Sequence, residues 1–115
     1  MPKCISKTAR AARICDLNDA FRTTLEGGQI VITGGVVARG LAFHREMIAQ
    51  IRGFASFEAD NDPYGEHDFG ALTVRGKKIF FKIEYFDRDL TYGSPDPADP
   101  SVTARVLTIM LAEEY

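Results

Sequence analysis

Apolar residues recur every three or four positions near the start of the chain, which is the period of one α-helix face. This pattern predicts a helix over residues 6–25, ended by Gly27-Gly28, because glycine readily takes the left-handed conformation of a helix C-terminus. Residues 29–33 are short, β-branched and bounded by glycines, which predicts a strand. A second helix is expected over residues 38–53, with an apolar face made of Leu41, Met47, Ile48 and Ile51.

The second half of the chain alternates apolar and polar positions, which is typical of strands. We expect strands over residues 69–74 and 78–86, joined by a tight turn at Gly76-Lys77. The expected pairing sets Val74 opposite Ile79, Leu72 opposite Phe81, and Gly70 opposite Ile83, all on one face with Tyr85. Prolines make residues 87–100 a loop. Residues 102–112 are nearly all apolar and favour a strand buried on both faces, although a helix over 104–114 remains an alternative.

The predicted fold is therefore a single α+β domain over residues 1–115, with element order α-β-α-β-β-β. It has about four mostly antiparallel strands and two helices packed on one face of the sheet. A composition of 45% hydrophobic and 26% charged residues is ordinary for a soluble globular domain of this size.

Charge and cysteine content narrow the functional classes. No apolar run approaches the roughly 18 residues of a membrane span, and the N-terminus lacks the apolar centre of a secretory signal. We therefore expect a cytoplasmic protein without membrane contact. Since the cytosol keeps thiols reduced, Cys4 and Cys15 are expected to be free thiols rather than a disulfide. Residues 56–115 carry twelve Asp and Glu against six Lys and Arg, which disfavours nucleic acid as the partner.

The densest chemistry lies in the acidic loop, residues 60–68. An EF-hand is excluded, because Tyr64 and Ala71 stand where calcium ligands are needed. Two site hypotheses remain open: His67 as a general base with Asp68 and Glu66, or a metal held by Asp62, Glu66 and His67. The alternative is structural: His67 pins the loop through a hydrogen bond, and Asn61-Asp62-Pro63 begins a turn. No cofactor is expected.

The outward face of the predicted hairpin combines aromatic and charged side chains. This indicates a surface that binds another protein, or a second copy in a homodimer, through Phe69, Phe80, Lys82, Glu84 and Phe86. The alternative is that polar side chains and a loop cover these aromatics. The aromatic rings of this face could stack on the bases of a single-stranded nucleic acid, but the excess of acidic over basic side chains in residues 56–115 disfavours such a partner. A buried Arg105 is expected to pair with an aspartate of the preceding loop.

Three long motifs, over residues 61–70, 80–87 and 99–115, resemble an uncharacterised family of small proteins common in alphaproteobacteria and on their plasmids. Leu17-Asn18-Asp19-Ala20-Phe21-Arg22 resembles the opening helix of that family. The resemblance implies no established activity. It implies carriage on mobile elements, where neighbouring genes often act against host defences such as restriction or CRISPR systems.

The leading hypothesis is therefore a non-enzymatic protein that binds another macromolecule, because no complete catalytic constellation accompanies the aromatic face. The rival is a metal-dependent enzyme or a small-ligand-binding protein with its site in the acidic loop.

Overall fold

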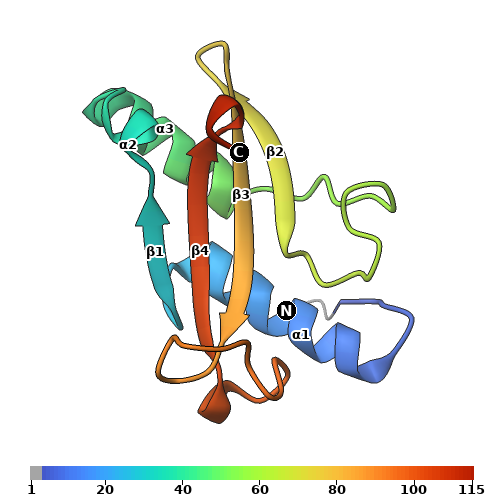
Figure 1. Ribbon diagram of the computed structural model, residues 1–115. Coiled ribbons are helices and arrows are strands. Elements are labelled where there is room, and N and C mark those ends of the chain that lie inside the picture. The colour runs from blue at the N-terminus through green and yellow to red at the C-terminus, as the bar shows by residue number, and fades with distance from the viewer. Residues whose placement is uncertain (1–3) are drawn as a thin grey trace.

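The structure, a computed structural model, describes residues 4–115 and is built on one four-stranded mixed sheet (Figure 1). The strand order is β1-β4-β3-β2, with β1 parallel to β4 and the other two pairs antiparallel. The elements, in chain order, are α1 (Ala9–Thr24), β1 (Gln29–Ile32), α2 (Gly34–Val37), α3 (Leu41–Arg52), β2 (Phe69–Val74), β3 (Lys77–Phe86), the 3-10 turn η1 (Pro100–Val102), β4 (Ala104–Leu111) and the 3-10 turn η2 (Ala112–Glu114).

This architecture confirms the predicted α+β class with two helices on one face of the sheet. Residues 104–111 form a strand, which decides between the two alternatives left open for the C-terminal segment. The single-turn helix α2 was not predicted. It occupies Gly34–Val37, between the predicted strand over residues 29–33 and the predicted helix over residues 38–53. Among the described residues, no helix has the length and apolarity needed to cross a lipid bilayer.

The hairpin pairs in a different register from the one predicted. Arg75 and Gly76 both have positive φ values, 50° and 80°, and together form a two-residue turn. Val74 therefore pairs with Lys77, so that Leu72 lies opposite Ile79 and Gly70 opposite Phe81. The predicted pairing was wrong by two residues, but the faces are as expected, because side chains alternate with a period of two.

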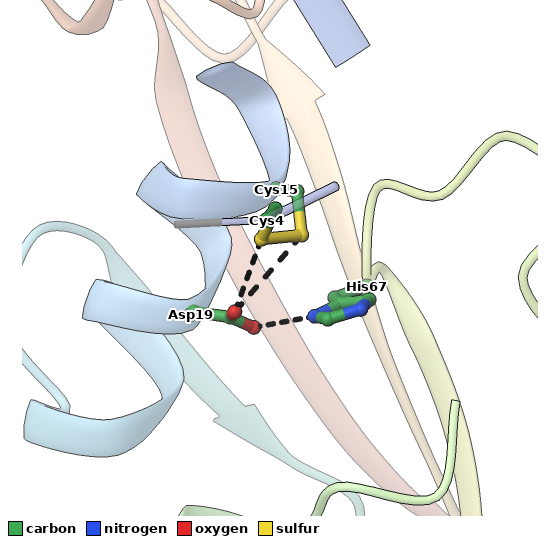
Figure 2. A group of neighbouring side chains, drawn as sticks. All are labelled: Cys4, Cys15, Asp19 and His67. Carbon is green, nitrogen blue, oxygen red and sulfur yellow. Dashed lines mark hydrogen bonds and ion pairs between the residues drawn. A yellow bond between two sulfur atoms is a disulfide. The ribbon is translucent and has the colours of Figure 1, made fainter. Parts of the chain in front are cut away.

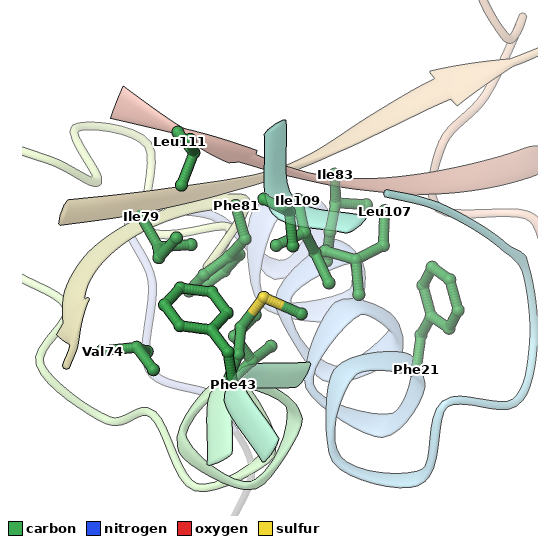
Figure 3. Packing of buried hydrophobic residues seen from close by; sticks show 12 residues of the cluster. Phe21, Phe43, Val74, Ile79, Phe81, Ile83, Leu107, Ile109 and Leu111 are labelled. Carbon is green, nitrogen blue, oxygen red and sulfur yellow. The ribbon is translucent and has the colours of Figure 1, made fainter. Parts of the chain in front are cut away.

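The hydrophobic core lies between the sheet and the two longer helices (Figure 3). Strand β3 contributes every second residue to it, through Ile79, Phe81 and Ile83. Strand β4 contributes Leu107, Ile109 and Leu111, and its outward residues Val106 and Met110 are buried as well, as expected of a strand buried on both faces. Helix α3 contributes a wholly apolar face through Phe43, Met47 and Ile51. The core cluster consists of Phe21, Val36, Phe43, Met47, Ile51, Val74, Ile79, Phe81, Ile83, Leu107, Ile109 and Leu111.

Helix α1 differs from α3, because polar side chains share its buried face. Thr8 caps its N-terminus by accepting the N–H of Ala11 at 3.0 Å, and Leu25 ends it in the left-handed conformation. Ile14 and Phe21 are buried as the period predicts, but so are Asn18 and Arg22. These polar residues face the acidic loop and the lower end of the sheet, where the candidate site lies.

Candidate functional site

The buried side chain of Asp62 holds the acidic loop in shape through hydrogen bonds to its backbone. Only 8% of the residue is exposed. One carboxylate oxygen, Oδ1, accepts the backbone N–H groups of Glu66 at 3.0 Å and His67 at 3.1 Å. A carboxylate that accepts two N–H groups a few residues downstream fixes the path of a turn. Asp62 therefore has a structural task, whatever else it does.

His67 connects the acidic loop to helix α1. Its Nδ1 lies 2.8 Å from Asp19 Oδ1, and its Nε2 lies 3.8 Å from Asp62 Oδ2. The ring of Phe57 stacks on the imidazole with centroids 3.9 Å apart and planes 7° apart. The imidazole is thus fixed in plane and position, with a carboxylate near each ring nitrogen.

Arg22 joins the two long helices to this group. Its Nη2 donates to Asp19 at 2.9 Å, so the carboxylate that meets His67 is also paired with a cation. Its Nη1 donates to the carbonyls of Ile51 at 3.3 Å and Arg52 at 3.4 Å, at the end of α3. The guanidinium thus adds hydrogen bonds at the C-terminus of α3, where the Ile51 carbonyl also accepts the backbone N–H of Phe54 at 3.2 Å.

A second set of hydrogen bonds runs from Glu66 into the sheet. The Tyr85 hydroxyl donates to Glu66 Oε1 at 2.9 Å and accepts from Asn18 Nδ2 at 2.8 Å. Asn18 Oδ1 in turn accepts from Arg105 Nε at 2.9 Å. Arg105 also donates to the carbonyl of Pro97 and lies over the Tyr85 ring, 5.4 Å from its centroid. The expected pairing of Arg105 with a loop aspartate is therefore wrong: an amide and a carbonyl satisfy this buried cation.

Burial shifts the ionisation of three groups here. It raises the pKa of the Tyr85 hydroxyl and lowers the pKa of the Arg105 guanidinium, because both charged forms lose hydration. Burial, together with the nearby Glu66 carboxylate, also raises the pKa of Asp68. Tyr85 therefore stays neutral at physiological pH and serves as a hydrogen-bonding hydroxyl.

The two cysteines form a disulfide, so the expectation of free thiols was wrong. Its physical reason is the path of the N-terminal segment: the backbone N–H of Cys4 donates to Asp16 Oδ1 at 2.7 Å and lays the segment along α1. The Cα atoms of Cys4 and Cys15 are then 5.9 Å apart, within the usual span of a disulfide. Cys4 Sγ lies 3.2 Å from Asp19 Oδ2, whereas His67 meets the other oxygen of the same carboxylate, Oδ1 (Figure 2).

The predicted site residues are therefore divided among different partners. Glu66 turns to Tyr85, and His67 is oriented by Asp19 rather than by Asp68. Of the metal candidates Asp62, Glu66 and His67, the structure brings Asp62 and His67 closest together. Within residues 4–115, the sulfur, carboxylate and imidazole atoms that lie within 4.8 Å of one another are instead those of Cys4, Cys15, Asp19 and His67.

Sequence reasoning missed the contributions of Asn18, Asp19, Arg22 and Tyr85. A signal was present in α1, because Asn18 and Arg22 follow Ile14 by four and eight positions and so fall on its buried face. Polar residues at such positions need partners and indicate a buried network.

The predicted binding surface lies on the opposite face of the sheet. Both α1 and α3 pack behind the sheet, and neither covers the front of β3 and β4, where the short 3-10 turn η2 lies at one end (Figure 1). On this face Phe69 and Phe80 have centroids 5.3 Å apart, and Tyr115 packs edge-on against Phe80 at 5.5 Å. Lys82 Nζ lies 3.3 Å from Glu84 Oε1, and Phe86 lies further along the same strand.

Comparison with known proteins gives one match. The family model described as "Protein of unknown function (DUF3768)" matches residues 32–114, and the chain belongs to this family. No curated protein and no solved structure matches the chain. The match covers the whole sheet apart from the first three residues of β1, together with the acidic loop, but not α1.

Proposed function

We propose that this member of the DUF3768 family is a protein-binding module that docks its partner on the helix-free face of the sheet. The observation that carries the proposal is the composition of that face. Aromatic side chains from β2, β3 and the C-terminus meet there: Phe69 and Phe80 are half-buried, Tyr115 packs against Phe80, and neither α1 nor α3 covers them. Aromatic residues surrounded by charged groups are typical of the centre of a protein interface.

The geometry of this docking face suits a protein better than a nucleic acid. Phe69, Lys82, Thr108 and Val31 lie side by side across the four strands, so the face is continuous. Its central charges, Lys82 and Glu84, pair with each other, and Lys78, over the Phe80 ring, adds a single positive charge rather than a large positive excess. A phosphate backbone needs such an excess, whereas an apolar protein surface with a charged rim does not.

The face is also rigid. It is carried by strands that pair along their length, and Tyr115, with 75% of the residue exposed, adds an accessible ring at one edge. Binding on a preformed sheet costs little conformational entropy, since few backbone groups are ordered when the partner arrives. The motif resemblance implies carriage on mobile elements, and on that expectation we propose host-defence proteins, of the restriction or CRISPR type, as the first partners to try.

The test replaces two aromatic residues of the face while sparing the core. Phe80→Ser with Phe86→Ser should abolish binding to a partner that the wild-type chain captures, while the circular dichroism spectrum stays unchanged. Tyr64→Ser is the matched control, because Tyr64 is 73% exposed but lies in the acidic loop, and it should bind normally. Undiminished binding by the folded double variant would exclude this face as the docking surface. Light scattering of the wild type reports the remaining outcome, a second copy of the chain as the occupant.

A second candidate function is a ligand or metal site near the acidic loop. One observation favours it: the imidazole of His67 is held beside Asp19 and the two sulfur atoms (Figure 2).

A further inference from the structure

Four side chains that can ligate a metal meet beside helix α1. Cys15 and Asp19 lie one turn apart on α1, Cys4 comes from the segment before it, and His67 comes from the acidic loop (Figure 2). One ligand atom from each residue lies within 4.8 Å of the other three. Two sulfurs, an imidazole nitrogen and a carboxylate oxygen form a donor set that zinc commonly takes in proteins.

The distances among these atoms already approach those of a tetrahedral centre. Usual zinc bond lengths require about 3.6 Å between a sulfur and an oxygen ligand and about 3.4 Å between a nitrogen and an oxygen ligand. Asp19 Oδ2 lies 3.2 Å from Cys4 Sγ and 3.9 Å from Cys15 Sγ, and Asp19 Oδ1 lies 2.8 Å from His67 Nδ1. Because Oδ2 faces the sulfurs and Oδ1 faces the imidazole, the carboxylate must turn so that one oxygen becomes the ligand, and the sulfurs of the opened disulfide must separate to about 3.8 Å.

The surroundings of His67 match those of a metal-bound histidine. With Nδ1 facing the metal position, Nε2 faces Asp62 Oδ2 at 3.8 Å. A ligating histidine usually gives its second ring nitrogen to a carboxylate, which fixes the tautomer and the ring orientation. Asp62 is itself held by two backbone N–H groups, and Phe57 fixes the plane of the ring.

Charge is also balanced at this position. A divalent zinc ion with two thiolates and one carboxylate carries a net charge of about −1. Arg22, which is buried and pairs with Asp19 at 2.9 Å, supplies the compensating positive charge. The ion, its ligands and Arg22 would thus sum to about zero, with the buried Asp62 behind His67 adding one further negative charge.

From these observations we infer that the chain has two exclusive states, a Cys4–Cys15 disulfide and a zinc centre formed by Cys4, Cys15, Asp19 and His67. A dithiol reductant converts the first to the second. The disulfide takes up two electrons and two protons to give two thiols, while the reductant is oxidised to its own disulfide. Binding of Zn²⁺ then releases both thiol protons to solvent and forms two zinc–thiolate bonds. In a reducing cytosol the metal-bound state is the relevant one.

The two states differ in what they connect. The disulfide ties Cys4 to Cys15, which joins the N-terminal segment to α1 alone. The zinc centre adds His67 as a ligand, so a metal bond would replace the His67–Asp19 hydrogen bond that links the acidic loop to α1 in the disulfide form. Zinc binding therefore couples the loop to the redox state of the two thiols.

The experiment uses the full chain in two redox forms. Protein reduced with a phosphine and handled without oxygen is titrated with Co²⁺ and then with Zn²⁺. We expect one Co²⁺ per chain, with thiolate charge-transfer and tetrahedral d–d absorption bands that Zn²⁺ abolishes. Bound Zn²⁺ should protect both cysteines from alkylation, and the oxidised form should bind no metal at this site.

Matched variants assign the ligands. Cys4→Ser, which alters a segment outside the helices, should remove the charge-transfer band from that sulfur and weaken binding at least tenfold. Asp62→Asn, behind His67, should weaken binding about 10–100-fold without changing the number of thiolate bonds. His44→Ala removes the other histidine of the chain and should leave binding unchanged. The absence of metal binding by the reduced wild type, or full binding by a Cys4→Ser, Cys15→Ser chain, would overturn the inference.

Discussion

The two ends of the core-facing side of the sheet are built on different physical principles. At the apolar end, Phe81 and Ile109 pack against α3 through Met47, and all three residues have no exposed surface. At the polar end, the cross-strand partners Tyr85 and Arg105 meet α1 through hydrogen bonds to Asn18. The same two strands, β3 and β4, supply both ends.

The two ends differ in how strictly they fix the arrangement of the helices on the sheet. Apolar packing gains free energy from area removed from water and tolerates some change of shape. A buried polar network is favourable only while every member keeps its partner, so it fixes how the parts align. The apolar end thus supplies most of the stability, and the polar end positions α1 and the acidic loop on the sheet.

The largest expected effect comes from breaking the apolar end. Phe81→Ala removes a fully buried ring that contacts Phe54 and Phe57 edge-on, and it should lower the free energy of unfolding by about 3–5 kcal/mol. Urea denaturation followed by circular dichroism measures this loss. Phe86→Ala, which truncates a ring of the outward face, is the control and should cost clearly less. Equal losses would contradict the assignment of the two faces.

A smaller loss is expected from breaking the polar end. Asn18→Ala leaves the Arg105 guanidinium and the Tyr85 hydroxyl short of a partner and should cost about 1.5–3 kcal/mol. Replacing both buried polar groups, as Asn18→Leu with Arg105→Met, should recover much of the loss, because no unpaired charge remains. A double variant that is as unstable as the sum of the single variants would show that the two residues act independently.

The smallest effect is a pH dependence at the edge of the polar end. The folded-state pKa of Asp68 is raised by burial and by Glu66, so folding favours the protonated form. The stability that this protonation contributes is complete below the ordinary pKa of 3.8 and is lost as the pH rises through the raised value. Asp68→Asn should therefore be more stable than the wild type at pH 7.

Thermal denaturation at several pH values checks this prediction. The advantage of Asp68→Asn should shrink as the pH falls and disappear below the ordinary pKa of aspartate. An advantage that stays constant across the range would trace to something other than the carboxylate charge, and a destabilised variant at pH 7 would contradict the stated direction.

The sequence predicts the apolar end well and the polar end poorly. The periodicity of apolar residues finds the elements and their inward faces, including the burial of Ile79 and Ile83, because large apolar side chains are favourable in the core and unfavourable in water. Periodicity cannot name the partner of a buried cation. Arg105 meets an asparagine 87 positions earlier in the chain, and that distance carries no sequence signal.

The other differences between the predicted and the observed structure lie in the hairpin turn and in the N-terminal segment. The hairpin register depends on the positive φ of Arg75. Because non-glycine residues rarely take a positive φ, the sequence gives no indication of it. The disulfide follows from the position of Cys4 beside α1, which is set by its backbone hydrogen bond to Asp16 rather than by the spacing of the cysteines. His67 was recognised, but its partner Asp19 lies on a helix far away in the sequence.

The strand order has a consequence for biosynthesis. Strand β4 is the last of the four to leave the ribosome, yet it lies between β1 and β3 and is the only strand that pairs with β1 in the described chain. Until it emerges, the nascent polypeptide can form the β2–β3 hairpin but leaves β1 without a neighbour. Premature termination before Ala104 would thus deprive the product of its central strand and leave it exposed to proteases.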